Sequence, residues 1–428
     1  MSDLKEYDLW IQENGPAALV IRDHLIPVEG ADGVFFPATF AGQQGADKDK
    51  NKFQGGYNID RFPDGTNVCL IDSVGSQANR IEPIFTQSDY AGLVPQIVVT
   101  FPEKGIRLNL LHANHRAADA IIRCSEFEVP LKHAFLEVLR GNAEPLAKFA
   151  PTSLVFGVWD SRVTYAKLPR LMSSTIRAFN IVEHTRSANF LIQMTIDLAK
   201  LDILPGAESK DGFANALASK APGGVQLMPN GSIRRDATVG LAALRRMSVL
   251  EADGKLSIER TLTLRRYILG LTLVALTAPH ESYLRQGCNL VPDINQPRKF
   301  SVVNTDGSRP DAIVTHAEAL KYAKTAAKEF GVGKDSEKRF EVSRAEKVAE
   351  GKPEKLKVEV ISLDVAARTF KVKTGKGKDV KEIDITTNDD TAITKGKDTL
   401  AFDSVVVAGA LLDIELLNGI AIKVTSKK

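Results

Sequence analysis

The chain has few of the features that mark secreted or membrane proteins. It holds only three cysteines, Cys69, Cys124 and Cys288, with no Cys-x-x-Cys pair, so each is expected to be a small buried hydrophobe in a reducing cytoplasm. Met1 to Asp8 carries acids where a signal peptide needs cations. The most apolar run, Ile268 to Ala278, falls short of the about 20 residues that span a bilayer. We therefore expect a cytoplasmic protein without a membrane contact.

The sequence also lacks a strong excess of either charge. The formal net charge is +3 at pH 7, so a nucleic-acid-binding surface would have to arise from local clustering of cations. His112 and His115 stand three residues apart, but no cysteine or acid at ligand spacing accompanies them, and we predict no metal site. With 428 residues, 43% of them hydrophobic, the chain can build two or three globular domains.

A strand followed by a helix is predicted at residues 68–82. Val68 to Ile71 is an apolar run after a Pro-Asp-Gly turn signal, which favours a short buried strand. Asp72 or Ser73 then caps a helix, and Pro83 ends it because the residue before a proline is pushed out of the helical region.

The polar side of this helix suits a phosphodiester backbone. Unpaired N–H groups at a helix start favour an anion, and hydroxyl, amide and guanidinium groups donate hydrogen bonds to phosphate. The alternative, an ordinary amphipathic helix with a solvated polar face, stays open. The candidate phosphate contacts on the helix are Ser73, Ser76, Gln77, Asn79 and Arg80.

A second pair of candidates is Arg234 and Arg235, which precede a helical pattern over Ala237 to Leu250. Two arginines at the positive end of a helix are unfavourable unless an anion lies there. Asp236 as the N-cap residue would satisfy one arginine, whereas a phosphate would satisfy both.

Further cations lie in a segment that also carries aromatic residues, a composition typical of surfaces that bind single-stranded nucleic acid. A solvated sheet edge is the alternative. The candidates here are Arg170, Arg177 and Arg186, with Arg162 and Lys167 beside them and Tyr165, Phe179 and Phe190 between them. Arg116, in a helix predicted over Asn114 to Arg123, is a further candidate.

The remaining patterns predict the other elements and the connections between them. Strands are predicted at 17–22, 96–100, 106–111 and 153–159, and helices at 131–140, 144–149 and 315–330. Residues 41–56 are predicted to be a mobile loop, and residues 206–231 a long connection or an excursion from the main fold. A charged linker over 331–354 leads to alternating segments at 356–360, 369–374, 380–386, 391–394, 404–408 and 421–425, which indicate a small all-β barrel, OB-like in architecture, over 355–428.

The block from Asp72 to Glu82 resembles the signature of the repeated backbone subunit of the type I-U, now I-G, CRISPR interference complex. Shorter segments that fit the same family run in order through roughly residues 15 to 330: Leu19 to Arg22, Val34 to Pro37, His115 to Ala120, Phe156 to Ser161 and Gly231 to Asp236. The resemblance implies an α+β fold over residues 1–330, with a modified RRM-like (ferredoxin-like) palm and inserted finger and thumb elements.

The resemblance also implies a function. It indicates a non-catalytic subunit, without a cofactor, that polymerises along CRISPR RNA as a helical filament and leaves the spacer bases to pair with a target DNA strand. Its partners would be the RNA, other copies of itself and other Cascade subunits. The candidate residues named above would then contact the RNA backbone.

Two other functions stay open. Related subunits of type III complexes cut target RNA with an aspartate, and Asp72, Asp160 and Asp236 together with His112 and His115 are the groups available here. The second alternative is a structural scaffold that binds no nucleic acid, which the near-neutral net charge permits. The resemblance stops before the C-terminal barrel, whose role the sequence leaves open.

Overall fold

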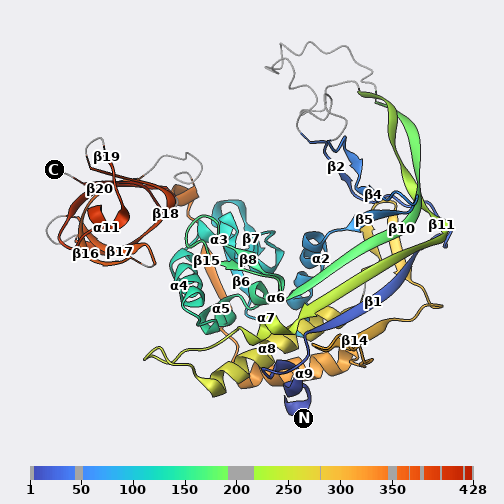
Figure 1. Cartoon of the computed structure of the whole chain (residues 1–428), viewed down its shortest axis with the longest axis horizontal. Coiled ribbons are helices and arrows are strands. Elements are labelled where there is room, and N and C mark those ends of the chain that lie inside the picture. Colours follow the sequence, from blue (N-terminus) through green and yellow to red (C-terminus); the bar gives the residue numbers. More distant parts are fainter. Residues whose placement is uncertain are drawn as a thin grey trace.

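The protein is a mixed α+β structure with several separate sheets (Figure 1). The computed structural model describes residues 4–43, 52–190, 216–279, 281–345, 354–365, 367–375, 380–395, 398–417 and 420–426. The predicted α+β class is confirmed. Among these residues, no helix combines the length and the hydropathy that crossing a membrane requires.

The largest sheet is antiparallel, and its strands run in the order β12-β13-β1-β11-β10-β5-β4, with β14 also paired to β1. Its strands are β1 (Ala18–Pro27), β4 (Ile59–Arg61), β5 (Asn67–Asp72), β10 (Met172–Phe190), β11 (Ala216–Gly240), β12 (Tyr283–Arg285), β13 (Cys288–Pro292) and β14 (Lys299–Val303). Figure 1 shows β10 and β11 continuing as a two-stranded ribbon beyond the other strands.

Helices lie beside this sheet and in a neighbouring cluster (Figure 1). They are α1 (Asp8–Ile11), α2 (Val74–Ile81), α3 (Ala120–Arg123), α4 (Glu128–Leu139), α5 (Glu144–Phe149), α6 (Thr152–Phe156), α7 (Leu241–Arg245), α8 (Ile258–Thr277) and α9 (His316–Phe330). Ser73 caps α2 by accepting a hydrogen bond from the Ser76 N–H, as the sequence predicted. Thr315 caps α9 in a reciprocal capping box with Glu318.

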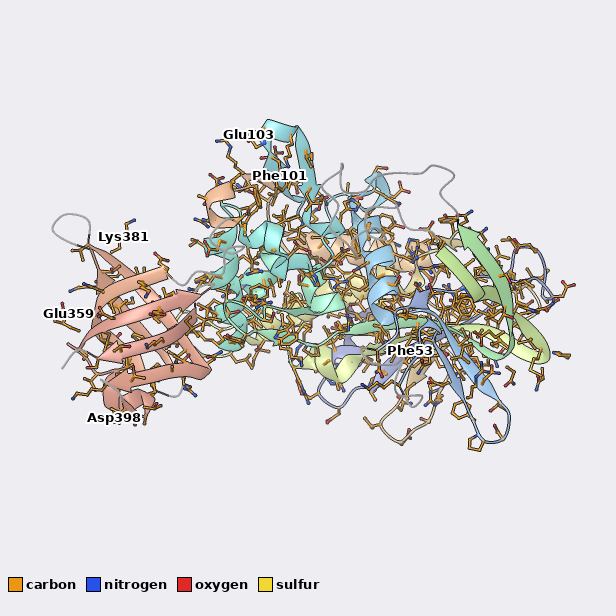
Figure 2. All side chains as sticks on the ribbon, turned by 90° about the horizontal axis from the view of Figure 1, so that it is seen from above. Phe53, Phe101, Glu103, Glu359, Lys381 and Asp398 are labelled. Atoms are coloured by element: carbon orange, nitrogen blue, oxygen red, sulfur yellow. The ribbon has the colours of Figure 1, made fainter. Side chains whose placement is uncertain are left out.

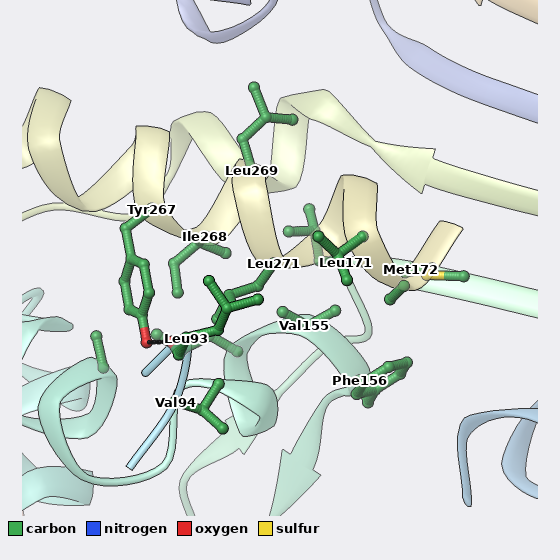
Figure 3. Close-up of a cluster of buried hydrophobic side chains, with 14 of the residues drawn as sticks. Leu93, Val94, Val155, Phe156, Leu171, Met172, Tyr267, Ile268, Leu269 and Leu271 are labelled. Atoms are coloured by element: carbon green, nitrogen blue, oxygen red, sulfur yellow. Dashed lines mark hydrogen bonds between the residues drawn. The ribbon is translucent and has the colours of Figure 1, made fainter. Parts of the chain in front are cut away.

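Helix α8 forms the centre of the main core. Its residues from Arg266 to Thr277 are all buried, which is why its hydrophobic residues occupy every side of the helix rather than one stripe. The Tyr267 hydroxyl donates a hydrogen bond to the Leu93 carbonyl at 2.7 Å (Figure 3). The Tyr267 ring stacks on Phe330 with 4.6 Å between the ring centroids. The most apolar run of the sequence, Ile268 to Ala278, is therefore part of the core.

Smaller sheets complete the main part of the chain. They are β15 (Ser336–Arg339) with β6 (Ile97–Phe101) and β7 (Ile106–Asn109), the pair β2 (Thr39–Phe40) and β3 (Gly56–Tyr57), and the pair β8 (Val158–Trp159) and β9 (Lys167–Leu168). Strand β15 lies within the predicted linker 331–354, so part of that segment is not a linker but pairs in parallel with β6.

The C-terminal strands make a sheet with its own hydrophobic cluster. Its elements are β16 (Glu354–Asp364), β17 (Thr369–Thr374), β18 (Lys381–Lys395), β19 (Asp398–Thr399), β20 (Leu411–Leu417), β21 (Ile420–Ser426) and the short helix α11 (Phe402–Val405). The strand predicted at 404–408 is wrong, since part of that run is α11, and β20 was not predicted.

Three further predictions in the main part are corrected. Residues 153–159 are mostly helix α6 rather than a strand, because periodicity does not separate a short buried helix from a buried strand. The helix predicted over 114–123 is a 3-10 turn followed by α3, which Asp119 caps. The helix predicted over 237–250 begins only at Leu241, because β11 continues to Gly240.

The predicted loop 41–56 and the predicted excursion 206–231 are described only in part. Residues 44–51 and 206–215 lie outside the described residues. Residues 216–231 belong to β11 and pair with β10, so this part of the excursion is a strand of the ribbon.

Gly270 allows α8 and α9 to approach closely. A Cβ at this position would lie 2.9 Å from the Ala323 Cα, so we expect Gly270→Ala to lower the free energy of unfolding by about 1–3 kcal/mol despite the better helix propensity of alanine. Urea unfolding measures the change. The matched control is Gly75→Ala in α2, where the nearest atom is the end of the Arg170 side chain at 4.0 Å. That variant is expected to unfold no more easily than wild type, and equal effects of the two changes would contradict the packing argument.

Candidate nucleic-acid interface

The two faces of the main sheet differ sharply in character. Along β11, Ile233, Arg235 and Ala237 are buried, whereas the alternating residues Arg234 and Asp236 are partly exposed. Helices α2 and α8 both lie on the buried face: Ser174 on β10 donates a hydrogen bond to Gln77 of α2, and Arg235 donates one to the Leu276 carbonyl of α8. The side chains on the other face are therefore not covered by these two helices.

The face opposite α2 and α8 carries basic side chains directly opposite one another on neighbouring strands. In the register of β1, β11 and β10, His24 pairs with Arg234, and Arg234 pairs with Arg177. In the adjacent row, Lys299 on β14 pairs with Arg22 on β1. We call these five residues, Arg22, His24, Arg177, Arg234 and Lys299, the basic face. Like charges directly opposite in a sheet are destabilising unless something compensates them.

Asp236 compensates part of this charge. It accepts hydrogen bonds at 2.9 Å from the Nε atoms of both Arg22 and Arg234. Burial acts to raise the pKa of Asp236, but these two arginines outweigh it and hold the pKa below its usual range. Burial, followed by repulsion from Arg234 and Arg22, lowers the pKa of His24. A lowered pKa keeps His24 neutral at pH 7. The basic face still has an excess of positive charge, because Arg22, Arg177, Arg234 and Lys299 outnumber the single carboxylate of Asp236.

An aromatic ring adjoins the cations. The Arg234 guanidinium lies over the Phe179 ring, 4.2 Å from its centroid. Phe179 is partly exposed and belongs to β10, two residues beyond Arg177, so both side chains are on the same side of the strand. The face thus combines guanidinium groups with one aromatic surface.

The position of the two consecutive arginines corrects the sequence prediction. Arg234 and Arg235 do not begin a helix; both lie on β11, and alternation sends them to opposite faces. Arg235 is only 2% exposed and donates a 2.8 Å hydrogen bond to Asp23, which also pairs with Arg298. Only Arg234 is available to a ligand.

The candidates on α2 also separate into two groups. Ser73 and Ser76 are partly exposed at the start of the helix and Asn79 is exposed. Arg170 is exposed next to this helix start, with its guanidinium 4.0 Å from the position of a Cβ on Gly75. These residues stay in the candidate interface.

Gln77 and Arg80 instead hold α2 against the sheet. Gln77 is 3% exposed and donates a 2.7 Å hydrogen bond to Asp72. Arg80 donates to the same carboxylate at 3.2 Å and to the Leu284 carbonyl at 2.5 Å. Together with Arg235 they line a cavity of about 210 Å³ on the buried face. The expectation that Gln77 is exposed is wrong, and the guanidinium of Arg80 already has partners.

Arg116 is also an internal residue. It is 5% exposed, forms a 2.6 Å ion pair with the buried Glu82, and lies over the Phe156 ring. It further donates to the Asn79 side chain at 3.3 Å. Arg116 therefore has a structural role, because removing it would leave the Glu82 carboxylate buried without a partner. The prediction that Arg116 is exposed is wrong.

The last predicted contact, Arg186, lies on the ribbon. It is exposed and donates a hydrogen bond to the Pro222 carbonyl across β10 and β11. The structure therefore brings Arg177 and Arg234 together, places Arg170 beside Ser73 and Ser76, and leaves Arg186 in a separate region.

The aspartates and histidines that would be available to a ribonuclease do not converge on one site. Asp72 is engaged by Gln77 and Arg80, Asp236 by two arginines, and Asp160 by the backbone and side chain of Thr164. His112 and His115 are exposed on the connection before α3. In the part of the chain that the structure describes, no three His, Cys, Asp or Glu residues gather as metal ligands would.

Sequence reasoning missed several members of the basic face, namely Arg22, His24 and Lys299. The alternation of β1 contained the signal, because Arg22 and His24 fall between the buried residues Ile21, Asp23 and Leu25. Lys299 had no such signal, since only the pairing of β14 with β1 brings it beside Arg22.

Burial of Glu82 provides a pH test of the internal pair. Burial raises the pKa of Glu82 to about 7, although Arg116 acts to lower it. The ordinary pKa of a glutamate is 4.5, and that of Glu82 in the folded protein is about 7. Between pH 4.5 and about pH 7, the unfolded chain therefore releases this proton while the folded chain retains it. The folded state loses stability as the pH rises through this window. We expect the free energy of unfolding of wild type to fall relative to that of Glu82→Gln by on the order of 2 kcal/mol.

Denaturant unfolding of both proteins at a series of pH values measures this difference. The glutamine variant does not titrate at this position, so the contributions of other groups cancel. A difference that stays constant from pH 4 to 8 would contradict the assignment.

Residues 19–183 match the family model described as CRISPR-associated protein GSU0053. The matched segment includes α2, Arg22, His24 and Arg177 and ends before β11. No curated protein matches the chain.

Proposed function

The chain belongs to a CRISPR-associated family, and on this premise we propose that it is a non-catalytic subunit that binds CRISPR RNA by its phosphate backbone. The observation that carries the proposal is the basic face, above all the direct opposition of Arg177 and Arg234 on adjacent strands. An RNA phosphate between the two guanidinium groups would replace their repulsion by two charge-assisted hydrogen bonds.

The remaining groups of the face suit the same ligand. Phe179 offers a surface on which a base or ribose packs, and Arg22 and Lys299 extend the positive charge across β1 and β14. None of these contacts depends on the identity of a base. A subunit that binds CRISPR RNAs of many sequences needs contacts that are independent of the bases. The protein then contacts phosphate and sugar, while base pairing recognises the target DNA strand.

The topology supports an RRM-like palm. Strands β14, β1, β11 and β10 are neighbours in that order, α2 lies between β1 and β10 in sequence, and α8 lies between β11 and β14. This is the order of a β-α-β-β-α-β unit with β5 and β4 added at one edge. RRM domains bind single-stranded RNA on the sheet face opposite their two helices, which is the position of the basic face here.

Polymerisation and the inserted elements are part of the same proposal. The ribbon of β10 and β11 extends beyond the sheet (Figure 1), and we assign it the role of the inserted finger or thumb element that reaches a neighbouring copy on the same RNA. Arg186 lies on this ribbon. Other Cascade subunits would contact the ends of the filament.

The C-terminal strands are proposed to form a small barrel that takes no part in RNA binding. The additional pairing of β17 with β18 closes the strand order on itself. Lysines on its strands face acids: Lys373 pairs with Glu359 and Lys371 with Asp384. Figure 2 shows Glu359 and Lys381 pointing outward from this sheet. Such pairs leave little net charge for a phosphate backbone.

The first test measures RNA affinity against salt concentration. For single strands, the slope of log affinity against log salt is about −0.7 per phosphate neutralised, so the double variant Arg177→Gln, Arg234→Gln should bind more weakly with a slope flatter by about 1.4. The control is Arg140→Gln, Arg246→Gln, which removes two exposed arginines from helix ends away from the face. Equal slopes for the double variant and wild type would overturn the assignment of the basic face.

The second test concerns polymerisation and catalysis together. With RNAs of increasing length, the mass of the complex should rise in steps of one protein copy, as measured by light scattering. In the presence of Mg²⁺ and a complementary target RNA, both strands should stay full length on a denaturing gel. A mass that stays at one copy would contradict the filament, and cleavage at regular positions would favour the ribonuclease alternative.

A further inference from the structure

The hairpin of β8 and β9 exposes a tryptophan that nothing in the basic face uses. Trp159 is 59% exposed, although it is one of only two tryptophans in the chain. Leaving so large an apolar ring in water forfeits the free energy its burial would give. A ligand that covers the ring would recover that free energy.

The hairpin holds this ring in a defined position. Asp160, which follows it, is 3% exposed and accepts hydrogen bonds from the Thr164 N–H at 2.9 Å and the Thr164 hydroxyl at 2.8 Å. The Asp160 N–H in turn donates to the Ala166 carbonyl. A ring displayed on an ordered turn loses little conformational freedom when a ligand binds.

The surroundings of the ring are cationic. Lys167, its cross-strand partner, places its ammonium group 5.2 Å from the ring centroid. Arg162 and Arg170 are also exposed on this segment. Asp160 is the one acid between residues 157 and 171, and it is buried and already hydrogen-bonded. The exposed charge of the hairpin is therefore entirely positive.

We propose that Trp159 stacks a nucleobase of the bound single-stranded RNA, while Lys167 and Arg170 contact the flanking phosphates. This inference rests on the proposed function and adds to it a base-contacting position outside the basic face. A flat π surface surrounded by cations matches a nucleotide, which combines a base with an anionic phosphate.

The position of Arg170 connects the hairpin to the other RNA candidates. Its backbone and side chain pack against Gly157 at the start of the hairpin, and its guanidinium lies beside Gly75 at the start of α2. An RNA strand that contacts Ser73 and Ser76 would therefore continue past Arg170 toward Trp159. The stacking position follows from this path and is independent of Arg177 and Arg234.

Tryptophan fluorescence tests the stacking directly. Trp10 packs on Tyr7 at 4.6 Å, so Trp10→Phe retains an aromatic ring there and leaves Trp159 as the single indole. The probes are a short single-stranded oligoribonucleotide and an abasic oligomer of the same length and charge, each with a terminal dye that reports binding by anisotropy. Both should bind, but only the oligomer with bases should quench Trp159 emission.

Affinity measurements give a second readout. Stacking on an aromatic side chain is worth about 1–3 kcal/mol per base, so Trp159→Leu should weaken binding of the oligoribonucleotide by roughly 5- to 150-fold. The salt slope should not change, since no phosphate contact is lost. Trp159→Tyr should restore most of the affinity, and binding of the abasic oligomer should be the same in all three proteins.

The outcomes separate this inference from the proposed function. Binding of both oligomers without quenching, or equal quenching by both, would overturn the stacking while leaving backbone binding intact. A change of Trp159 emission that depends on protein concentration alone would assign the ring to an interface between copies and overturn the inference. If wild type bound neither oligomer, the proposed function and this inference would fail together.

Discussion

The arrangement of the candidate interface depends on the alternation of side chains in β1, β10 and β11. These strands present one face to the helices, so every second residue must be apolar or internally paired. The residues between them then share the opposite face. Arg234 and Arg235 show the effect most clearly: they are adjacent in sequence, yet one is an available cation and the other a buried partner of Asp23.

Buried polar pairs fix the position of α2 relative to this sheet. Asp72 at the end of β5 accepts hydrogen bonds from Gln77 and Arg80 one and two turns along the helix. At the other end, Glu82 pairs with Arg116 from the connection before α3. These groups are costly to bury unless they are satisfied, so they specify one placement of the helix. That placement leaves Ser73 and Ser76 at its partly exposed end.

The candidate RNA contacts lie on two kinds of secondary structure. The basic face lies on regular strands, where cross-strand register fixes the spacing of the cations. Trp159 lies on a short hairpin ordered by a buried aspartate. Both sites belong to secondary structure with internal hydrogen bonds, which limits the ordering cost on binding. The C-terminal sheet has paired charges and a separate core, and it contains neither of these candidate contacts.

The sequence by itself determined the local structure with strong signals. The β5 strand, the Ser73 cap, helices α4, α5 and α9, and the strands β6 and β7 follow from apolar periodicity and from turn and cap residues, which act over a few positions. The block around α2 also led to the CRISPR-associated family. Short apolar runs such as residues 153–159 were predicted wrongly, because their period is ambiguous.

Tertiary structure decided which charged residues are available. Gln77, Arg116 and Arg235 looked equivalent to Ser76, Arg170 and Arg234 in sequence, but packing buried the first three against specific acids or amides. Lys299 and Arg22 became neighbours only through pairing of strands far apart in the chain. The physical reason is that burial and charge pairing depend on contacts between distant segments, whereas sequence patterns report only the nearest few residues.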